Sequence, residues 1–476
     1  MSNYGIFMEK LTSYCVIALL AICTMVFFNY SGKSQILGIA KENTDYFPFK
    51  EYALPDFPNN TCTITDYGAT TDPLILNTRP IQAAIDDCSK EGGSVIIPEG
   101  KWFTGGLKMK SHVNLKISRG AELVFSTNPK DYLPAVFTRL EGLELYNYSP
   151  LIYADGIENA AITGKGRLNG KGDEWENWRD EEKDSLEKAY EMAQNDVPVA
   201  NRIFGKEKYS LRPSFIQFVN SKNIWLEDFT LTDGPKWGIH PLYSENVFIS
   251  NVKIKTDGPN SDGIVIDSSK NVLVENSVLE TGDDSIAIKS GLDNDGWRVN
   301  RPSEDIIIRD IEINDGHSGV AIGSEMSGGV RNVLVRNLNI DDVDRGIRVK
   351  SLRGRGGFVE NIWIEKIIIK KADRVGIEID LTYDSSTVES EAEKIPVVKN
   401  FQIKDVRIEE TQRPLRLEGI GAIPIEKVLF SNITTENSEE GILVRNSKDV
   451  EFQNVTMEKL EKKPLFDIEN SENISH

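Results

Sequence analysis

A polar residue, most often asparagine, followed by a short run of alternating apolar residues recurs along this chain from about residue 156 onward. Most neighbouring copies lie roughly 22 to 39 residues apart, which is the range of the coils of solenoid proteins. The copies begin at Asn159, Asn223, Asn246, Asn271, Asp305, Asn332, Asn361, Asn400, Lys427 and Asp449. Each copy predicts about three short β segments joined by turns. No copy could bury its apolar face alone, so the copies must stack.

The repeat predicts an all-β fold, a parallel β-helix of about ten coils, in a chain of 476 residues. Length alone would suggest two or three domains, but stacked coils can form one domain of this size because each coil contacts only its neighbours. An asparagine at the same turn of each coil predicts a ladder of side-chain hydrogen bonds along the stack. We therefore expect a structural role for Asn223, Asn246, Asn271, Asn332 and Asn361.

The region before the repeat predicts a cap. Residues 78–89 place Ile81, Ala84, Ile85 and Cys88 at helical spacing. We expect this amphipathic helix to close the N-terminal end of the β-helix.

The remaining segments differ in character. Residues 1–31 contain an apolar run shorter than the ~20 residues of a spanning helix, which predicts a signal peptide and leaves an uncleaved N-terminal anchor open. Residues 32–60 are interpreted as an extended lead-in, and residues 61–476 as a single β-helix domain. Residues 173–213 interrupt the coils with a charged helix. Insertions in solenoids lie on one face, often the binding face.

Composition limits the partners and the compartment. A formal net charge of −19 argues against nucleic acid, whose binding needs a basic surface. The signal-like segment predicts export to the periplasm or the extracellular space. Cys62 and Cys88 lie outside that segment, and in an exported protein they form either a disulfide or two buried thiols. The oligomeric state is not fixed by the sequence.

Four short segments of the repeat carry charged or titratable groups in one register. They are residues 260–263 (Asn-Ser-Asp-Gly), 282–285 (Gly-Asp-Asp-Ser), 316–319 (Gly-His-Ser-Gly) and 345–350 (Arg-Gly-Ile-Arg-Val-Lys). Each runs into a short strand with two inward apolar residues. Aligning those apolar pairs also aligns the polar residues.

In this alignment Asp262 and Asp284 share one position, and Asp283 and His317 share the position before it. Neighbouring strands lie about 4.8 Å apart, so stacking would bring three carboxylates and a histidine together. Three adjacent carboxylates repel one another, so at least one should have a raised pKa and keep its proton near neutral pH. A protonated acid beside a carboxylate is what glycoside hydrolysis requires.

Arg348 and Lys350 are predicted to point outward about 10 Å along the stack from Asp284. They supply fixed positive charge where a uronate carboxylate could dock, bidentately at Arg348. The outward positions of Lys289, His240 and Tyr383 also suit substrate contact, although polar side chains that only contact water would occupy such positions nearly as often.

Taken in order, these four segments resemble the signature segments of glycoside hydrolase family 28, the polygalacturonases, over nearly the whole chain after the lead-in. The resemblance implies a right-handed parallel β-helix that hydrolyses pectic polymers with inversion and without a metal or other cofactor. It implies that Asp283 is the general acid, that Asp262 and Asp284 activate water, and that His317 tunes the acid. Arg348 and Lys350 would bind the galacturonate carboxylate.

Departures from the family pattern are small. Ser261 replaces the usual threonine, Ser285 stands where cysteine is common, and Ser318 follows His317 where glycine is usual. Residues 237–241 and 323–329 resemble bacterial members that act from chain ends. The insertion at 173–213 could close one end of the cleft, so we expect exo action on α-1,4-galacturonosyl linkages.

Other functions remain open at this point. A decorated pectic polymer, such as rhamnogalacturonan or xylogalacturonan, could be the substrate. A pectate lyase on the same architecture would use the three aspartates as Ca²⁺ ligands. A glycan-binding β-helix without catalysis is the third reading. The predicted carboxyl spacing also lies near the ~5 Å typical of retention, whereas the resemblance implies inversion.

Overall fold

A computed structural model of the chain describes residues 46–50, 53–206, 211–383, 393–421 and 423–476. The predicted signal segment, residues 1–31, and most of the lead-in lie outside the described residues. Among the residues that are described, no helix has both the length and the apolar character required to cross a membrane.

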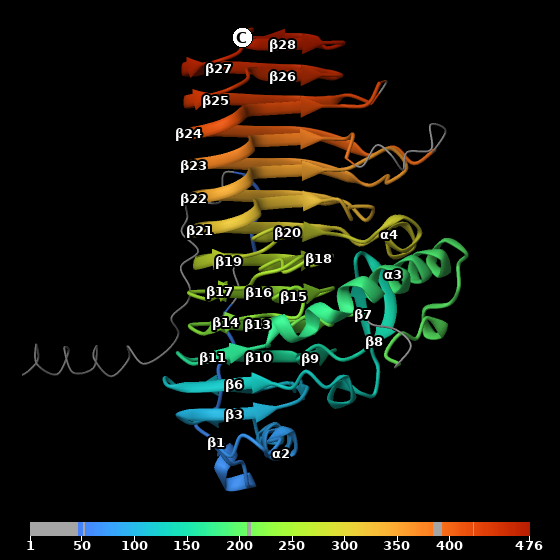
Figure 1. Cartoon of the computed structure of the whole chain (residues 1–476), viewed down its shortest axis with the longest axis vertical. Coiled ribbons are helices and arrows are strands. Elements are labelled where there is room, and N and C mark those ends of the chain that lie inside the picture. The colour runs from blue at the N-terminus through green and yellow to red at the C-terminus, as the bar shows by residue number, and fades with distance from the viewer. Residues whose placement is uncertain (1–45, 51–52, 207–210, 384–392, 422) are drawn as a thin grey trace, which may run out of the picture. The chain divides into compact units, whose positions relative to one another are not determined.

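The described chain forms a right-handed parallel β-helix, which confirms the predicted fold class (Figure 1). Each coil contributes strands to three faces, and each strand pairs in parallel with the equivalent strand of the next coil. The first face begins with β1 (Thr61–Thr63), β2 (Gly93–Ile97), β5 (Val113–Ile117), β10 (Glu158–Thr163), β13 (Lys222–Glu227) and β16 (Glu245–Ser250). The second face begins with β3 (Gly100–Thr104), β6 (Ala121–Phe125), β11 (Arg167–Asn169), β14 (Thr230–Thr232) and β17 (Lys253–Lys255). The third face begins with β4 (Leu107–Lys108), β9 (Ile152–Asp155), β12 (Ile216–Val219), β15 (Ile239–Leu242), β18 (Ile264–Asp267) and β20 (Ile286–Lys289).

Later coils use longer strands that bend around the stack. The strand β19 (Lys270–Glu280) covers the first and second faces, and its successors extend the same pairing. Those reaching the third face are β21 (Ser303–Gly323), β22 (Val330–Lys350), β23 (Phe358–Asp380) and β24 (Val397–Glu418). The last coils contain β25 (Ile425–Ser438), β26 (Ile442–Arg445), β27 (Ser447–Leu460), β28 (Phe466–Glu469) and β29 (Glu472–Ser475).

The core is built from columns of apolar side chains, each column formed by the equivalent inward position of successive coils. On the third face Ile264 pairs with Ile286, which pairs with Val320, which pairs with Ile347, and all four side chains are buried. Side chains alternate along a strand, so fixing this column inward directs the residues between its members outward. The apolar register therefore determines which polar residues reach the outer surface.

The predicted asparagine ladder is confirmed. Asn223 donates to Asn159 (2.9 Å), Asn246 donates to Asn223 (2.8 Å), and Asn271 donates to Asn246 (2.7 Å). In later coils Asn332 donates to Asp305, Asn361 to Asn332 and Asn400 to Asn361. These asparagines have positive φ angles, for example 56° at Asn246, which asparagine tolerates better than most residues.

The N-terminal cap is also confirmed. The helix α2 (Thr78–Cys88) follows a short turn, η2 (Ile64–Tyr67), and lies at the end of the stack (Figure 1). Its Ile81, Ala84, Ile85 and Cys88 side chains are all buried. Of the two alternatives for the cysteines, the structure has buried free thiols, and burial beside Cys62 raises the pKa of Cys88 to about 12.

Residues 46–50 of the lead-in lie against the first face. The Phe47 ring stacks on Trp363 with centroids 5.6 Å apart, and the Tyr46 hydroxyl donates to Glu365 (2.6 Å). Asn271 also donates to the carbonyl of Lys50 (2.9 Å). This part of the lead-in is therefore packed on the β-helix.

Several elements beside the third face depart from the regular coil. The insertion at 173–213 contains the expected helix, α3 (Arg179–Gln194), flanked by η4 (Gly172–Trp178) and η5 (Val199–Asn201). The sequence did not indicate the antiparallel hairpin of β7 (Val136–Leu140) and β8 (Leu143–Asn147), the turn η3 (Pro129–Tyr132) or the helix α4 (Asp293–Val299). Figure 1 shows α3, α4 and the hairpin gathered on one side of the stack.

The asparagine ladder generates a stability prediction. We expect Asn246→Ala to lower the free energy of unfolding by about 2–4 kcal/mol, because two side-chain hydrogen bonds are lost and alanine is strained at positive φ. The control Asn246→Gly removes the same hydrogen bonds without the strain and should lose about 1 kcal/mol less. Thermal and urea unfolding measure both variants. Equal losses would show that backbone conformation does not contribute.

Candidate active site

The three aspartates lie in the turns that lead from the second face to the third face. Asp262 precedes β18, and Asp283 and Asp284 precede β20 in the next coil. The Gly263 amide donates to the Asp284 carbonyl (3.1 Å), and the His317 amide donates to the Asp283 carbonyl (3.0 Å). The predicted register is therefore confirmed, and the four side chains come together on one side of the solenoid.

The three carboxylates differ in exposure. The side chains of Asp262 and Asp284 are 4% and 1% exposed, whereas that of Asp283 is 24% exposed. A group that approaches from solvent therefore meets Asp283 first. The side chains of Asp262 and Asp284 lie deeper than that of Asp283.

Asp283 is surrounded by donors. Its carboxylate accepts hydrogen bonds from the backbone amides of Asn260 (3.1 Å) and Asp284 (2.9 Å), and His317 Nδ1 lies 3.6 Å from it. Burial alone would raise the pKa of Asp283. The adjacent His317 imidazole and the positive charges of Lys350 and Lys289 outweigh burial and hold this pKa well below its usual range.

Asp262 shows the opposite behaviour. Burial raises the pKa of its carboxyl group well above the usual range, and the negative charges of Asp283 and Asp284 add to the rise. Lys289 Nζ, 3.9 Å from the carboxylate, offsets only part of this effect. The sequence-based expectation that one carboxyl of the cluster has a raised pKa is met at Asp262.

Lys289 lies at the centre of a buried charge cluster. Its ammonium contacts both oxygens of Glu325 (3.0 and 3.2 Å) and lies 5.1 Å from the Trp237 ring centroid. Burial disfavours the charged amine, but Glu325 and Asp262 raise the pKa of Lys289 well above its usual value. Lys289 is therefore not a solvated surface group, and its ammonium is engaged with Glu325 at the edge of the site.

The two predicted cations, Lys350 and Arg348, lie at the site, and each pairs with a carboxylate of the protein. Lys350 Nζ donates to Asp284 (2.9 Å), and Arg348 Nε lies 2.8 Å from Glu378. Tyr383 lies beside both, with its ring centroid 5.6 Å from Lys350 Nζ and 5.1 Å from the Arg348 guanidinium carbon. Asp284 raises the pKa of Lys350 even though burial opposes this.

His240 occupies a different environment from the one expected of a surface contact. Its side chain is fully buried, with Nδ1 2.8 Å from Gln217 and Nε2 3.6 Å from Asp267. Its ring makes an edge contact with Trp237 (5.0 Å), and burial lowers its pKa. In the structure the His240 side chain is therefore buried against Trp237 and does not face solvent.

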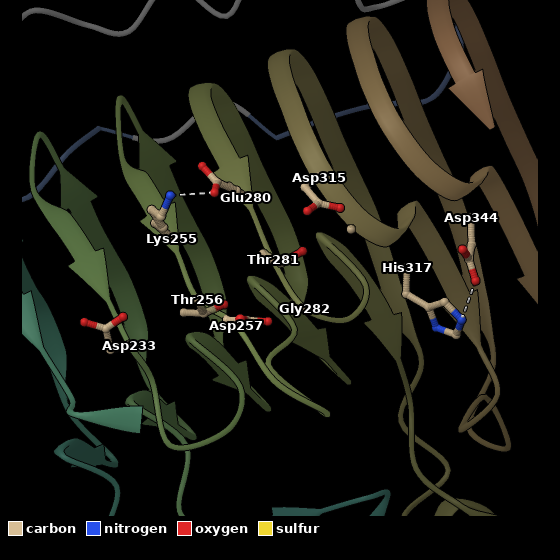
Figure 2. Close-up of a pocket in the computed structure, with 11 residues that line it drawn as sticks. Asp233, Lys255, Thr256, Asp257, Glu280, Thr281, Gly282, Asp315, His317 and Asp344 are labelled. Carbon is tan, nitrogen blue, oxygen red and sulfur yellow. Dashed lines mark hydrogen bonds and ion pairs between the residues drawn. The ribbon is translucent and has the colours of Figure 1, made fainter. Parts of the chain in front are cut away.

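His317 links the cluster to solvent. Its side chain is 43% exposed, and Nε2 lies 3.1 Å from Asp344 on the side away from Asp283. Ligand atoms of Asp283, Asp284 and His317 lie within 4.8 Å of one another, so these three residues could hold a cation. Figure 2 shows His317 directed toward Asp344 at the margin of a groove of about 490 Å³.

That groove, which we call the acidic groove, lies on the second-face side of the turns. Its charged lining residues are Asp233, Asp257, Glu280, Asp315, Asp344, Lys255 and His317. Figure 2 shows the carboxylates on successive coils and the contact between Lys255 and Glu280 (2.6 Å). Carboxylates outnumber lysines, so this surface would repel a polyanion.

The hairpin and the insertion lie beside the turns and loops that carry the site residues. Glu141, at the hairpin tip, contacts Lys236 (2.8 Å), and the adjacent Gly142 carbonyl accepts from the amide of Leu292 (3.0 Å). A side chain at Gly142 would clash with Leu292 and come within 3.0 Å of Glu325. The hairpin tip therefore packs tightly against the loops around Lys289.

The helix α3 holds this wall through buried charges. Glu182 pairs with Arg212 (2.6 Å) and with Lys236 (3.1 Å), and Arg212 donates to the side chain of Asn260 (3.2 Å). The expected charged surface helix thus has one buried side. The insertion makes a direct connection to the turn that carries Asp262.

Sequence reasoning missed several residues that contact the site. Glu378 lies in the outward position one coil after Arg348, and the same register argument would have found it. Asp344 immediately precedes the 345–350 segment, and Glu325 lies within the 323–329 segment, so their positions were visible but their contacts were not. Glu141 gave no signal, because it reaches the site from a hairpin outside the repeat.

Two carboxyl groups with opposite pKa shifts generate a prediction. The raised pKa of Asp262 means that the folded state loses stability as pH rises through that pKa, so Asp262→Asn should gain thermal stability over wild type as pH rises from 4 to 8.

Glu325 has a lowered pKa because Lys289 overcomes the effect of burial. Glu325→Gln should therefore be less stable than wild type at pH 7, and the deficit should shrink as pH falls below 4.5, the usual value.

Scanning calorimetry across pH measures both variants against wild type. Because the two substitutions remove carboxylates with opposite shifts, the two difference curves must slope in opposite directions. Parallel curves would contradict the assigned charge states.

Comparison with known proteins places this geometry in a family. The model of the glycosyl hydrolases family 28 matches residues 140–397. A probable polygalacturonase of Vitis vinifera is 30% identical over 404 residues, covering 81% of this chain and 76% of the relative. The exo-poly-alpha-D-galacturonosidase of Dickeya chrysanthemi is 28% identical over 437 residues, covering 83% and 71%.

Solved structures agree with the sequence comparisons. The crystal structure of a hyperthermoactive exopolygalacturonase from Thermotoga maritima superposes with a TM-score of 0.83 and 36% identity, covering 89% of this chain and 96% of that one. The family match, the identities and the shared coil architecture together show that this chain belongs to family 28 of the glycosyl hydrolases.

Proposed function

We propose that the protein hydrolyses α-1,4-galacturonosyl linkages of polygalacturonate, acting from a chain end with an inverting acid–base mechanism. One observation carries this proposal: the cluster of Asp262, Asp283, Asp284 and His317 lies beside Lys350 in a family 28 chain. Two of the related proteins described above are named as exo-acting galacturonan hydrolases.

Asp283 is the proposed general acid. It is the most exposed of the three carboxylates, so it can reach the glycosidic oxygen. Its proton passes to that oxygen as the bond between the anomeric carbon and the oxygen breaks. Water forms the new bond to the anomeric carbon, and the water proton passes to the Asp262–Asp284 pair.

The acid role requires that Asp283 be protonated when the sugar is bound, although its pKa is low in the free protein. A bound uronate adds negative charge and excludes water, and both changes raise the pKa of a nearby carboxyl group. His317 lies between Asp283 and solvent and can deliver the proton. This arrangement favours activity at mildly acidic pH.

Arg348 and Lys350 are proposed to bind the uronate carboxylate. Both are engaged with internal carboxylates, which hold them in place before the substrate arrives. A guanidinium has five N–H donors, so Arg348 can contact Glu378 and a uronate together. Tyr383 forms one side of the same position.

Exo action is proposed from the wall at the Asp262 end. The hairpin tip and α3 occupy the path that a longer sugar chain would need on that side, while Arg348 and Lys350 lie on the other side of Asp284. The terminal sugar would therefore bind against the wall, and the polymer would leave past Arg348.

We also propose that the protein is exported. Polygalacturonate lies outside the cytoplasm of the cell that degrades it, and the apolar run within residues 1–31 fits a signal peptide. N-terminal sequencing of protein recovered from periplasm or medium tests the processing.

The decisive experiment is digestion of polygalacturonate with sizing of the products over time. Monomer from the first time points supports exo hydrolysis, and proton NMR of the fresh products identifies the anomer and hence inversion. A rising ultraviolet absorbance that a chelator abolishes would instead indicate a lyase using the Asp283, Asp284 and His317 group. Activity only on decorated polymers would indicate a rhamnogalacturonan- or xylogalacturonan-type hydrolase.

Loss of the acid tests the mechanism. Asp283→Asn should lower kcat on polygalacturonate by about 10²–10⁴-fold, because the amide cannot protonate the leaving oxygen. The control Asp342→Asn changes an aspartate of β22 that pairs with Lys371 on the surface, and it should retain wild-type rates. If kcat of the Asp283→Asn variant stays within threefold of wild type, the assigned role is refuted.

The exo mode can be tested by loosening the hairpin. Leu140 and Leu143 pack with Ala189 and Ala193 of α3, so Leu140→Ala/Leu143→Ala should free the tip and increase the share of oligomeric products in early digests. The control Leu186→Ala weakens the same apolar cluster from the helix side and keeps the hairpin residues. If the double variant still releases monomer alone, the wall does not set the mode of cleavage.

A further inference from the structure

A second groove lies on the third face, beyond Arg348 toward the C-terminal coils, and has a volume of about 370 Å³. We call it the arginine groove. Its lining includes the five arginines Arg345, Arg374, Arg413, Arg416 and Arg445. Five guanidiniums face three carboxylates, an unusual balance for a chain with a net charge of −19.

The strand register shows that this groove continues the site. Arg416 occupies the same outward position as Arg348, two coils further along the third face. Arg445 occupies the position of Lys350, three coils further. At about 4.8 Å per coil, these groups lie roughly 10 and 14 Å beyond the two proposed uronate-binding cations.

The two regions are also joined by a shared carboxylate. Glu378 is fully buried and contacts Arg345 (2.8 Å), Arg348 (2.8 Å) and Arg416 (3.1 Å). It fixes one guanidinium of the site and two of the groove in a single arrangement. The groove is thus preorganised by the same interactions that hold Arg348.

Arg345 is buried, but the other four arginines retain accessible surface although each has an internal partner. The side chain of Arg374 is 59% exposed and lies 3.8 Å from Asp344, and that of Arg445 is 36% exposed beside Glu418 and Glu469. One carboxylate uses at most two of the five donors of a guanidinium in a bidentate pair. Donors therefore remain for an external anion.

The opposite charge of the acidic groove indicates which way a polyanion would run. The acidic groove, where carboxylates dominate, lies on the second-face side of the turns that carry Asp283 and His317. It adjoins the arginine groove where Asp344 lies 3.8 Å from Arg374. On the other side of the carboxylates, the hairpin contacts Lys236 through Glu141, and Arg212 of the insertion contacts Asn260. The arginine groove is the positively charged continuation of the site.

We propose that the arginine groove binds uronate carboxylates of the departing polymer, several sugars away from the cleaved bond, and so sets the preference for long chains over short ones. This inference rests on the proposed function, because it assumes a polyuronate substrate. Arg413, which contacts Glu440 and the Gly441 carbonyl, and Arg445 contribute to the binding without touching Arg348 or Glu378.

The test compares polygalacturonate with digalacturonate as substrates for Arg413→Gln/Arg445→Gln. The loss of two charged contacts should lower kcat/KM on the polymer by about tenfold, and kcat/KM on the dimer should change by less than about twofold. The polymer KM should also become less sensitive to salt. The matched control is Arg407→Gln, since Arg407 lies on the same strand β24, pairs with Glu436 and faces away from the groove. It should leave both substrates unchanged.

A purely structural role for these arginines predicts equal losses on polymer and dimer together with a lower melting temperature, and that result would overturn the proposal. Binding provides a readout that does not need turnover. In gels containing polygalacturonate, Asp283→Asn protein should be retarded, and adding the two arginine substitutions should reduce the retardation. If wild type cleaves no galacturonan, the proposed function fails, while unchanged retardation would reject the groove itself.

Discussion

The in-register stacking of parallel strands is the constraint on which this structure depends. Each coil repeats an inward apolar column, and the asparagine ladder fixes the turn of each coil against the next. A shift of one residue in any coil would reverse the direction of every side chain on its strand. Stacking fixes the backbone of each coil. The proposed catalytic groups therefore differ from the rest of the repeat only in the side chains at outward positions.

The site concentrates like charge that the fold must offset. Burial and the neighbouring carboxylates raise the pKa of Asp262, and Asp284 accepts a hydrogen bond from the Lys350 ammonium. Lys289 in turn is balanced by Glu325, so each buried charge has a partner within the same few coils. Buried ion pairs rarely add net stability, because desolvation consumes most of their attraction. Their evident role here is to hold charged groups in fixed positions around one sugar-binding surface.

The sequence was sufficient for the parts of the fold that follow the repeat. The register of Asp262, Asp283 and His317 came from inward isoleucines and valines, because the period of a strand is two. The hairpin with Glu141 and the helix α4 could not be anticipated, since neither belongs to a coil. The burial of His240 was also invisible, because it depends on Trp237 and on elements that cover its strand.

The elements outside the repeat give the symmetric scaffold a direction. A β-helix offers the same kind of surface along its whole length, so it provides no reason to cleave at an end. The insertion with α3 contacts the turn before Asp262, while five arginines line the third face beyond Arg348. A polyanion bound at such a site would be attracted by positive charge only on the side of the arginines. Under the proposed exo mode, a barrier and a charge gradient on opposite sides of the same three carboxylates would select the chain end.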